Sequence, residues 1–388
     1  MTDCPPYLDC NATTPLHPAA RDAMLPWLTG GRVGNPGSRT HAYGSDAQKA
    51  VTNAREQMSR VIGMASSGVV FTSGATESSN IALLGLAQHG AETGRCHIIS
   101  TEIEHKATLE PLGELAKRGC EVTLVKPDGT GRVSADALLR EVRDDTLLIS
   151  LIHVNNETGV VQPVAEVAEG LDDKSVFLHV DASQSFGKEL SGLVHERIDL
   201  MSVSGHKFGG PIGVGALLLR KRKYRYAPLN SLTFGGGQER GLRPGTIPVM
   251  LVVGMGAAAS AALESNTQWH SQCTTYRDQL LEELQCAAPA GFDLNTDVNF
   301  ALPNCINLSF RDGGGDWLDS EAVLLSLKNF WAASNGSACT SAGIEPSHVL
   351  VAQNLPMGRV RSAIRLSWCE RTPAVDWIGV KKALSRLI

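Results

Sequence analysis

Residues 176–221 read VFLHVDASQSFGKELSGLVHERIDLMSVSGHKFGGPIGVGALLLRK. Three short apolar runs, VFLHVD, LMSVSG and GVGALLLRK, lie in this stretch between polar and glycine-rich segments. Apolar runs of this length, bounded by turn residues, are typical of buried strands. Four similar runs precede them: VVFTSG at 69–74, HIIST at 97–101, EVTLV at 121–125 and TLLISLIHV at 146–154.

Helix-like patterns separate most of these runs, for example at 77–88 and at 107–117. The alternation predicts an α/β fold, with a mainly parallel seven-stranded sheet and helices on both faces. After residue 260 the pattern changes to a helical stretch at 267–286, followed by NCINLSF, EAVLLSLKNF and AIRLSW. We therefore predict a large domain over residues 16–260 and a smaller α+β domain formed by residues 1–15 and 261–388.

The composition is that of an ordinary globular chain. Of the 388 residues, 43% are hydrophobic and 19% are charged, and the formal net charge is -5. Neither nucleic acid nor a membrane is therefore expected as a direct partner. The N-terminal MTDCPPYLDCN lacks the apolar run of a signal peptide, and no stretch of about 18 apolar residues predicts a transmembrane helix. A cytoplasmic location is expected.

The nine cysteines are irregularly spaced and include no C-x-x-C pair, so neither a zinc site nor a thioredoxin motif is predicted. Most of them are expected to be reduced and to pack as small hydrophobes. The glycine triplets at 235–237 and 313–315 lack the form of a P-loop, so no nucleotide site is predicted.

Polar residues lie at the carboxyl end of most of the predicted strands or directly after it. Sheets of this kind bind ligands beyond the carboxyl ends of their strands. The extended N-terminal segment YLDCNATTP is expected to pack beside the same site. The residues at the strand ends are Thr72, Ser73, Gly74, Glu104, His105, Lys106, His153, Asn155, Asn156, Glu157, Asp181, Ser183, Gln184, Ser204, His206 and Lys207.

Lys207 in SGHKFGGP follows a predicted buried strand, where a lysine is costly unless it is paired or covalently used. A surface lysine on a loop is the alternative. Ser204 and His206 flank it, and Asp181 precedes it by one strand–helix–strand unit. A Schiff-base lysine with an acidic partner for a pyridinium nitrogen is typical of a pyridoxal 5'-phosphate site.

A phosphate group needs a helix N-terminus and hydroxyls, and TSGATESSN supplies both, with Ala75 and Thr76 opening a helix. Taken alone, such a turn is equally a simple helix cap. His105 in TEIEHKA is either a capping or surface histidine, or an imidazole that stacks on the cofactor ring and moves protons.

Two further residues complete the predicted chemistry. Cys339 in SNGSACTSAG lies among small residues, so an exposed reactive thiol is predicted, with a loop cysteine of no consequence as the alternative. Arg365 in the apolar AIRLSW would grip a substrate carboxylate bidentately, or form a structural salt bridge.

Nine segments in order resemble the cysteine desulfurases of the NifS/IscS type, within the class-V aminotransferases. The resemblance covers nearly the whole chain and implies a fold-type I transferase dependent on pyridoxal phosphate, like the aspartate aminotransferases, and a homodimer. The segments are YLDCNATTP, GNPGSRTHAYG, VFTSGATESSN, TEIEHKA, HVNNETGVVQP, HVDASQSFGK, SGHKFGGPIGVGAL, GGGQERGLRPGT and NGSACTS.

The resemblance implies that L-cysteine loses its sulfur to Cys339, which becomes a persulfide, and that L-alanine is released. It also implies a role for each site residue: Lys207 for the Schiff base, Asp181 for the pyridine nitrogen, Gln184 for the ring hydroxyl, His105 for stacking, Ala75, Thr76, Ser204 and His206 for the phosphate, Thr246 for the phosphate from the other subunit, and Asn156 and Arg365 for the substrate carboxylate.

Three positions depart from the family pattern. Cys10 stands where an aromatic residue is frequent, which predicts a second thiol near the active site, and Pro244 replaces a serine and would stiffen the segment that bears Thr246. The chain ends sooner after AIRLSW than members whose tail docks an iron–sulfur scaffold. The sulfur acceptor is therefore either such a scaffold or a protein of a specialised pathway, such as DNA phosphorothioation or tRNA thiolation.

Two other functions stay open at this stage. A small-molecule aminotransferase of the same fold would need Lys207 and Asp181 but would not need Cys339. A non-catalytic assembly protein would keep the fold without turnover.

Overall fold

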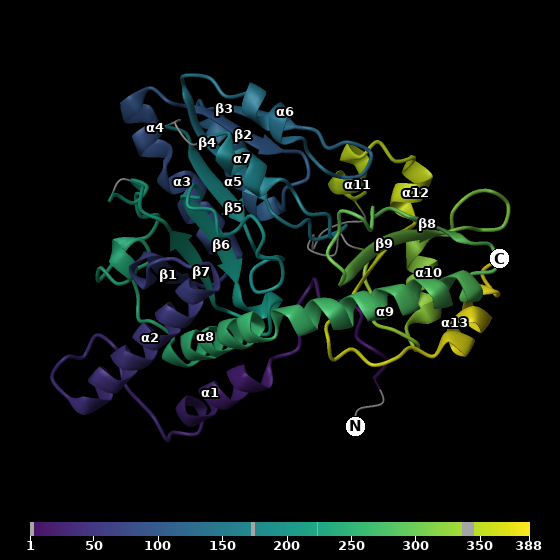
Figure 1. The fold of residues 1–388 in the computed structure, drawn as a ribbon, viewed down its shortest axis with the longest axis horizontal. Coiled ribbons are helices and arrows are strands. Elements are labelled where there is room, and N and C mark those ends of the chain that lie inside the picture. The colour runs from purple at the N-terminus through teal and green to yellow at the C-terminus, as the bar shows by residue number, and fades with distance from the viewer. Residues whose placement is uncertain (1–3, 172–174, 223, 336–344) are drawn as a thin grey trace.

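The computed structural model describes residues 4–171, 175–222, 224–335 and 345–388 (Figure 1). Its largest element is a seven-stranded sheet with the order β1-β7-β6-β5-β4-β2-β3. The strand β7 runs antiparallel to both of its neighbours, and all the other pairs are parallel. The predicted α/β class and mainly parallel sheet are confirmed. The strands are β1 Val69–Thr72, β2 His97–Thr101, β3 Glu121–Val125, β4 Thr146–Ile152, β5 Phe177–Asp181, β6 Leu200–Ser204 and β7 Gly215–Leu219.

Neighbouring residues of a strand point to opposite faces of a sheet, and both faces of this sheet are covered by helices. Met201 packs in one hydrophobic cluster with α2 and α8, whereas Leu200 packs in another with α3 and α5. Two covered faces explain why the strands are continuous apolar runs rather than alternating ones. The helices around the sheet are α1 Pro18–Leu28, α2 Ala42–Val61, α3 Ala75–Gly85, α4 Ala87–Thr93, α5 Lys106–Lys117, α6 Ala135–Arg140, α7 Val164–Glu169 and α8 Val249–Glu264.

The helix predicted at 77–88 is in fact two helices, α3 and α4, that meet at Leu86. The carbonyl of Gly85 accepts a hydrogen bond from Asn230 N (2.9 Å), which lies in a loop distant in sequence. A Cβ at position 85 would lie 3.0 Å from the Asn230 carbonyl oxygen, so the loop approaches closely because residue 85 is glycine.

A second sheet is antiparallel, with the order β10-β9-β8, and packs against the long helix α9 and against α10 and α13 (Figure 1). The predicted domain limits stay a prediction. Within the described residues no single helix is long and apolar enough to cross a membrane. Among the described helices, only the bent pair of α8 and α9 together has the length and apolar composition of a membrane span. The elements are α9 Asn266–Ala287, β8 Phe292–Leu294, β9 Cys305–Phe310, α10 Ser320–Leu327, α11 His348–Ala352, α12 Met357–Arg361, β10 Ala363–Ser367 and α13 Trp377–Leu384.

The segment at residues 7–15 connects the two sheets. It forms parallel bridges from Tyr7 to Ala332 and from Asp9 to Ser367, beside β10. Further along, Thr14 N donates to the carbonyl of His206, directly after β6. The segment therefore lies beside the carboxyl ends of the large sheet, as the sequence predicts.

Candidate active site

A cavity of about 590 Å³ opens at the carboxyl ends of β1, β4, β5 and β6. It brings together ten of the predicted site residues from segments far apart in the sequence. Asn11 and Ala12 of the N-terminal segment complete one side of it. The predicted residues that line the cavity are Ala75, Thr76, His105, Asn156, Asp181, Gln184, Ser204, His206, Lys207 and Arg365.

Two predicted site residues are not among those that line the cavity. Thr246 is exposed in the segment before α8, so its predicted contact with the phosphate of another subunit stays a prediction. Cys339 lies outside the described residues.

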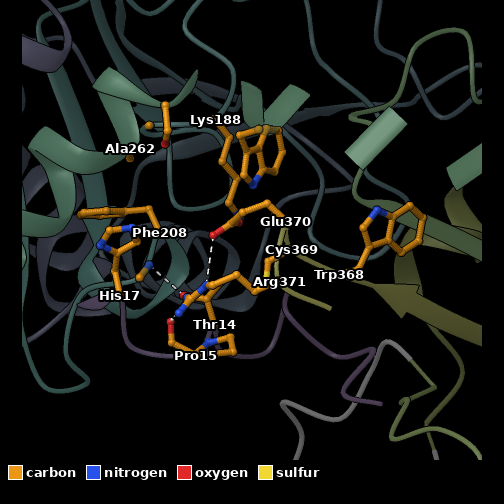
Figure 2. Close-up of a pocket in the computed structure, with 14 residues that line it drawn as sticks. Thr14, Pro15, His17, Lys188, Phe208, Ala262, Trp368, Cys369, Glu370 and Arg371 are labelled. Atoms are coloured by element: carbon orange, nitrogen blue, oxygen red, sulfur yellow. Dashed lines mark hydrogen bonds and ion pairs between the residues drawn. The ribbon is translucent and has the colours of Figure 1, made fainter. Parts of the chain in front are cut away.

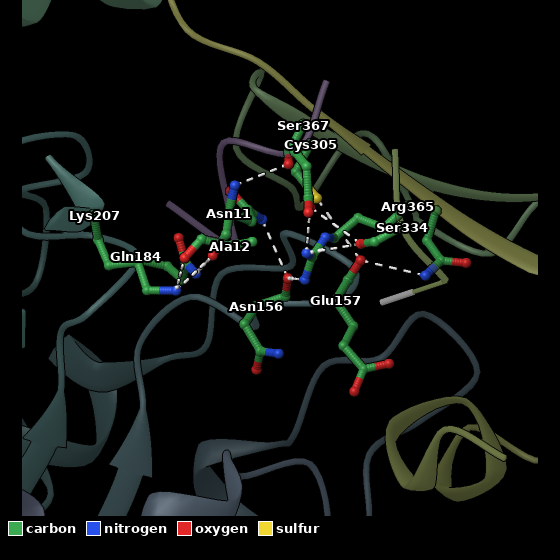
Figure 3. Close-up of polar contacts among 12 residues, drawn as sticks. Asn11, Ala12, Asn156, Glu157, Gln184, Lys207, Cys305, Ser334, Arg365 and Ser367 are labelled. Carbon is green, nitrogen blue, oxygen red and sulfur yellow. Dashed lines mark hydrogen bonds and ion pairs between the residues drawn. The ribbon is translucent and has the colours of Figure 1, made fainter. Parts of the chain in front are cut away.

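Lys207 ends the short 3-10 turn Gly205–Lys207 that follows β6. Its Nζ donates to the carbonyl oxygens of Asn11 (2.6 Å) and Ala12 (2.9 Å), as Figure 3 shows. The N-terminal segment therefore holds this amine at the wall of the cavity. No sequence pattern identified Asn11 or Ala12 as site residues, because their backbone carbonyls make these contacts.

Asp181 is the last residue of β5 and Gln184 follows it closely, and both line the cavity. Asp181 is 2% exposed, and its Oδ1 accepts from the backbone N of Ser183 (2.9 Å). Gln184 donates through Nε2 to the carbonyl of Asn11 (2.9 Å). Its buried Oε1 has no hydrogen-bond partner among the described residues, so it can receive a donor from a ligand.

His105 serves as a helix cap and also lines the cavity. Its Nδ1 accepts a hydrogen bond from Ala107 N (3.0 Å) at the start of α5. Burial lowers the pKa of His105, although the nearby Asp181 carboxylate opposes this shift. The imidazole is therefore neutral near pH 7, with its proton on Nε2. The capping and the functional interpretations of this residue are compatible.

Glu104, which precedes His105, is fully buried. Its Oε1 accepts from Thr101 Oγ1 (2.7 Å) and from Ile152 N (2.9 Å), and its Oε2 has no partner among the described residues. Burial raises the pKa of this carboxyl to about 8, and the charge of Asp181 adds to the shift. Glu104 is therefore mainly protonated at neutral pH.

The opposite end of the cavity is suited to an anion. Ala75 and Thr76 begin α3, so the first backbone N–H groups of this helix have no partner within it. Burial lowers the pKa of His206 to about 4, with the charge of Lys207 as a further cause, so this imidazole is neutral. The turn before α3 packs closely on β7: a Cβ at Gly215 would lie 2.5 Å from the Cα of Gly74.

Arg365 lies in β10 and is 3% exposed. Its Nη2 donates to Asp9 Oδ1 (2.6 Å). Figure 3 shows its further contacts, from Nη2 to Ser334 Oγ (3.0 Å) and from Nη1 to the carbonyl of Asn156 (2.9 Å). Its Nε is buried without a partner among the described residues. The structural salt bridge is thus present, and the side chain also lines the cavity.

Cys10, predicted as a second thiol near the active site, is fully buried and does not line the cavity. The next two residues, Asn11 and Ala12, do line it. Among the described residues, no group of three or more His, Cys, Asp or Glu side chains is arranged to hold a metal ion.

Comparison with known proteins identifies the family. The model of the family described as aminotransferase class-V matches residues 6–375. The chain belongs to the class-V aminotransferases. Within this family it is 42% identical over 390 residues to cysteine desulfurase IscS of Klebsiella pneumoniae, a match that covers 99% of this chain and 93% of the relative.

Solved structures agree with this assignment. DndA from Streptomyces lividans is 44% identical, with a TM-score of 0.80 over 95% of this chain and 100% of that one. A NifS-like protein is 33% identical, with a TM-score of 0.86 over 99% of this chain and 98% of that one. The predicted resemblance and fold are confirmed, and this class-V family uses pyridoxal phosphate.

The cavity fits this cofactor. The Oε1 of Gln184, which has no partner in the part of the chain that the structure describes, offers an acceptor to a ring hydroxyl, and the Asp181 carboxylate suits a protonated ring nitrogen. The start of α3, which lines the same cavity, suits the phosphate.

Proposed function

We propose that this protein is a cysteine desulfurase that takes sulfur from L-cysteine, releases L-alanine and carries the sulfur as a persulfide on Cys339. One observation carries the proposal. In a chain 42% identical to named cysteine desulfurases, Lys207 Nζ, the Asp181 carboxylate and the start of α3 line one cavity.

The cavity residues divide between the two ends of the cofactor. Lys207 would join the aldehyde of the cofactor, Asp181 would keep the ring nitrogen protonated and Gln184 would accept from the ring hydroxyl. When bound, pyridoxal phosphate supplies an electron sink that weakens bonds to the substrate amino acid. The neutral His105 stacks on the ring. The phosphate is held by Ala75, Thr76, Ser204 and His206, with Thr246 of a second subunit.

The substrate carboxylate is held by Asn156 and Arg365. The guanidinium stays charged inside the protein because Asp9 lies 2.6 Å from it. Three hydrogen bonds from its two terminal nitrogens go to protein partners, and the buried Nε, which has no partner among the described residues, can donate to a ligand or a water.

Proton movement during the reaction is assigned to Lys207. Its Nζ donates hydrogen bonds to two carbonyl oxygens of the N-terminal segment, which hold the amine at the wall of the cavity. The neutral imidazole of His105 can accept or donate a proton at Nε2. The Cys339 thiolate then takes the sulfur atom of the substrate, and the remaining carbon skeleton leaves as alanine.

The assembly and the acceptor are finer parts of the proposal. We propose a homodimer in which Thr246, which does not line the cavity of its own chain, reaches the phosphate in the other subunit, and we propose a cytoplasmic location. The acceptor is either an iron–sulfur scaffold or a protein of a specialised pathway, such as DNA phosphorothioation or tRNA thiolation. A persulfide-transfer assay with purified candidates of both kinds separates these alternatives.

The experiment that tests the activity compares Cys339→Ala with Cys286→Ala, a change at an exposed cysteine. We expect Cys339→Ala to retain pyridoxal absorbance but to lose alanine and sulfide production from L-cysteine, while Cys286→Ala keeps both. A small-molecule aminotransferase would keep turnover without Cys339. A non-catalytic protein would show no turnover in any variant.

A further inference from the structure

The turn Glu239–Gly241 lies in the segment between β7 and α8 and has an unusual backbone. Its first two residues, Glu239 (φ 48°) and Arg240 (φ 62°), adopt the left-handed region although neither is glycine, and Gly241 (φ 79°) follows them there. Such a backbone is costly for residues with a side chain, and it persists only where the surrounding structure holds it. The contacts that hold this turn therefore point to a functional constraint.

Glu239 makes these contacts through a buried carboxylate. The residue is 6% exposed, and both of its carboxylate oxygens accept hydrogen bonds from the guanidinium of Arg55 in α2, at 2.9 Å for Oε2. Oε2 also accepts from the backbone N of Phe71 (2.7 Å), the last residue but one of β1. Since β1 is an edge strand of the large sheet, the carboxylate stands where a further strand would otherwise pair. Glu239 thus fixes β1 directly before the strand ends.

Arg243, further along the same segment, contacts the other side of the turn that starts α3. Its Nε donates to Glu77 Oε1 (3.3 Å), in the first turn of α3. The other oxygen of this carboxylate accepts from the backbone N of Ser73. Residues 73–77 all line the Lys207 cavity, at the end that suits an anion. One segment therefore holds this turn from both sides, through β1 and through α3.

The charge of Arg243 also bears on anion binding. Glu77 lines the cavity, and a carboxylate at this place would repel a phosphate group. The guanidinium of Arg243 offsets that charge, and both side chains are only 27% exposed, so water and salt screen the pair incompletely. The segment thus contributes both support and charge compensation to the anion end of the cavity.

We propose that Glu239 and Arg243 are positioning residues for the cofactor phosphate, which hold residues 73–77 in the shape that presents the first N–H groups of α3. The inference rests on the proposed placement of the phosphate at Ala75 and Thr76. Helix N-termini bind an anion through N–H groups that point at it, so a displaced turn weakens the phosphate contact. The contacts to the cofactor ring come from other strands and should be unaffected.

The test compares two ligands of the full-length protein after removal of its cofactor: pyridoxal 5'-phosphate, and pyridoxal, which has the same ring and aldehyde but no phosphate. Absorbance titration gives the dissociation constant of each. The ratio of the constant for pyridoxal to that for pyridoxal 5'-phosphate reports the contribution of the phosphate alone. Glu239→Gln should lower this ratio at least about tenfold and change the constant for pyridoxal by less than about threefold. Arg243→Gln should lower the ratio about fivefold.

Asp199→Asn is the matched control for Glu239→Gln. The Asp199 carboxylate is likewise buried, pairs with Arg197 (2.7 Å) and accepts from the backbone N of a strand residue, Leu178 (2.9 Å). It lies at the amino ends of β5 and β6, whereas the cavity lies at their carboxyl ends. This variant should be less stable in urea but should keep the ratio of the parent protein.

Glu370→Gln is the matched control for Arg243→Gln. Glu370 forms a partly exposed ion pair with Arg371 (3.1 Å), beside a small second cavity whose lining residues all differ from those of the Lys207 cavity (Figure 2). The loss of this pair should leave both dissociation constants unchanged.

Equal weakening of both ligands in Glu239→Gln would overturn the proposal, since a general structural defect has that effect. So would a ratio that falls as far in Asp199→Asn. Where Glu239→Gln does not fold, Arg243→Gln decides, because its side chain is partly exposed and an unchanged ratio there also overturns the proposal.

Thr76→Val separates this inference from the proposed placement of the phosphate. If Thr76→Val lowers the ratio and neither Glu239→Gln nor Arg243→Gln does, the positioning role alone is wrong. If Thr76→Val leaves the ratio unchanged, the placement of the phosphate is wrong and the inference is overturned with it. No readout depends on turnover of L-cysteine.

Discussion

Replacement of Glu104 by glutamine should make the protein more resistant to alkaline conditions. The carboxyl is fully buried, and burial raises its pKa to about 8 from an ordinary value of 4.5. A carboxyl with a raised folded-state pKa destabilises the fold as pH rises, because the unfolded chain ionises it first. This cost begins near pH 4.5, grows until about pH 8 and is constant above that.

The size of the effect follows from the shift. Each pKa unit corresponds to about 1.4 kcal/mol, so the full cost to the parent protein is on the order of 5 kcal/mol above pH 8. The neutral amide introduced by Glu104→Gln would mimic the protonated carboxyl and carry no such cost. The difference in unfolding free energy, Glu104→Gln minus parent, should therefore rise by about 1.4 kcal/mol per pH unit between pH 5 and 8.

Urea denaturation at several pH values measures this difference, in which the titrations common to both proteins cancel. Glu110→Gln, a change at an exposed carboxyl on α5, is the matched control and should change the unfolding free energy by less than about 0.5 kcal/mol at every pH. A difference that is constant from pH 5 to 9 for Glu104→Gln would show that this carboxyl does not titrate in the folded protein as inferred here.

Other substitutions test the remaining contacts. Lys207→Ala should abolish alanine formation from L-cysteine, and the absorbance of bound pyridoxal should shift to that of the free aldehyde; unchanged spectra and turnover would contradict the role of this amine. Asp9→Asn leaves the buried charge of Arg365 uncompensated and should lower the unfolding free energy by about 3 kcal/mol in urea, and a loss below about 1 kcal/mol would contradict the salt bridge. Gly215→Ala pushes a Cβ against the turn before α3 and should weaken pyridoxal phosphate binding at least about tenfold in a spectroscopic titration, whereas Gly129→Ala, which enters open space, should not.

Six strands of the large sheet were predictable because each is buried on both sides and is therefore a mainly apolar run, whereas the edge strand β3 is partly exposed. Their pairing was not. Nothing in the sequence indicates that β7 runs antiparallel between β1 and β6, since the periodicity of a strand is independent of its direction. The break between α3 and α4 was also missed, and the loop contact at that point is made by Asn230, which is distant in sequence from Gly85.

The residues that contribute a characteristic side chain to the site could be predicted from the sequence. Asp181 and Lys207 follow strands and carry groups suited to the cofactor, and both line the cavity. Asn11 and Ala12 contribute backbone oxygens, which every residue type possesses, so no motif distinguishes them. The protonated state of Glu104 depends on burial that only the folded chain produces.

The two interpretations of Arg365, substrate binding and a structural salt bridge, support each other. A buried guanidinium that awaits an anionic substrate must stay charged in the empty cavity, and an uncompensated buried charge costs several kcal/mol. Asp9 supplies the compensating charge at 2.6 Å, and the carbonyl of Asn156 accepts from the other terminal nitrogen. These contacts fix the plane of the guanidinium, so the entropy of ordering it is lost on folding rather than on binding. Asp9 should therefore increase the affinity for the substrate carboxylate even though it carries the same charge. The corresponding measurement is the KM for L-cysteine, which Asp9→Asn should raise if orientation dominates and lower if charge repulsion dominates.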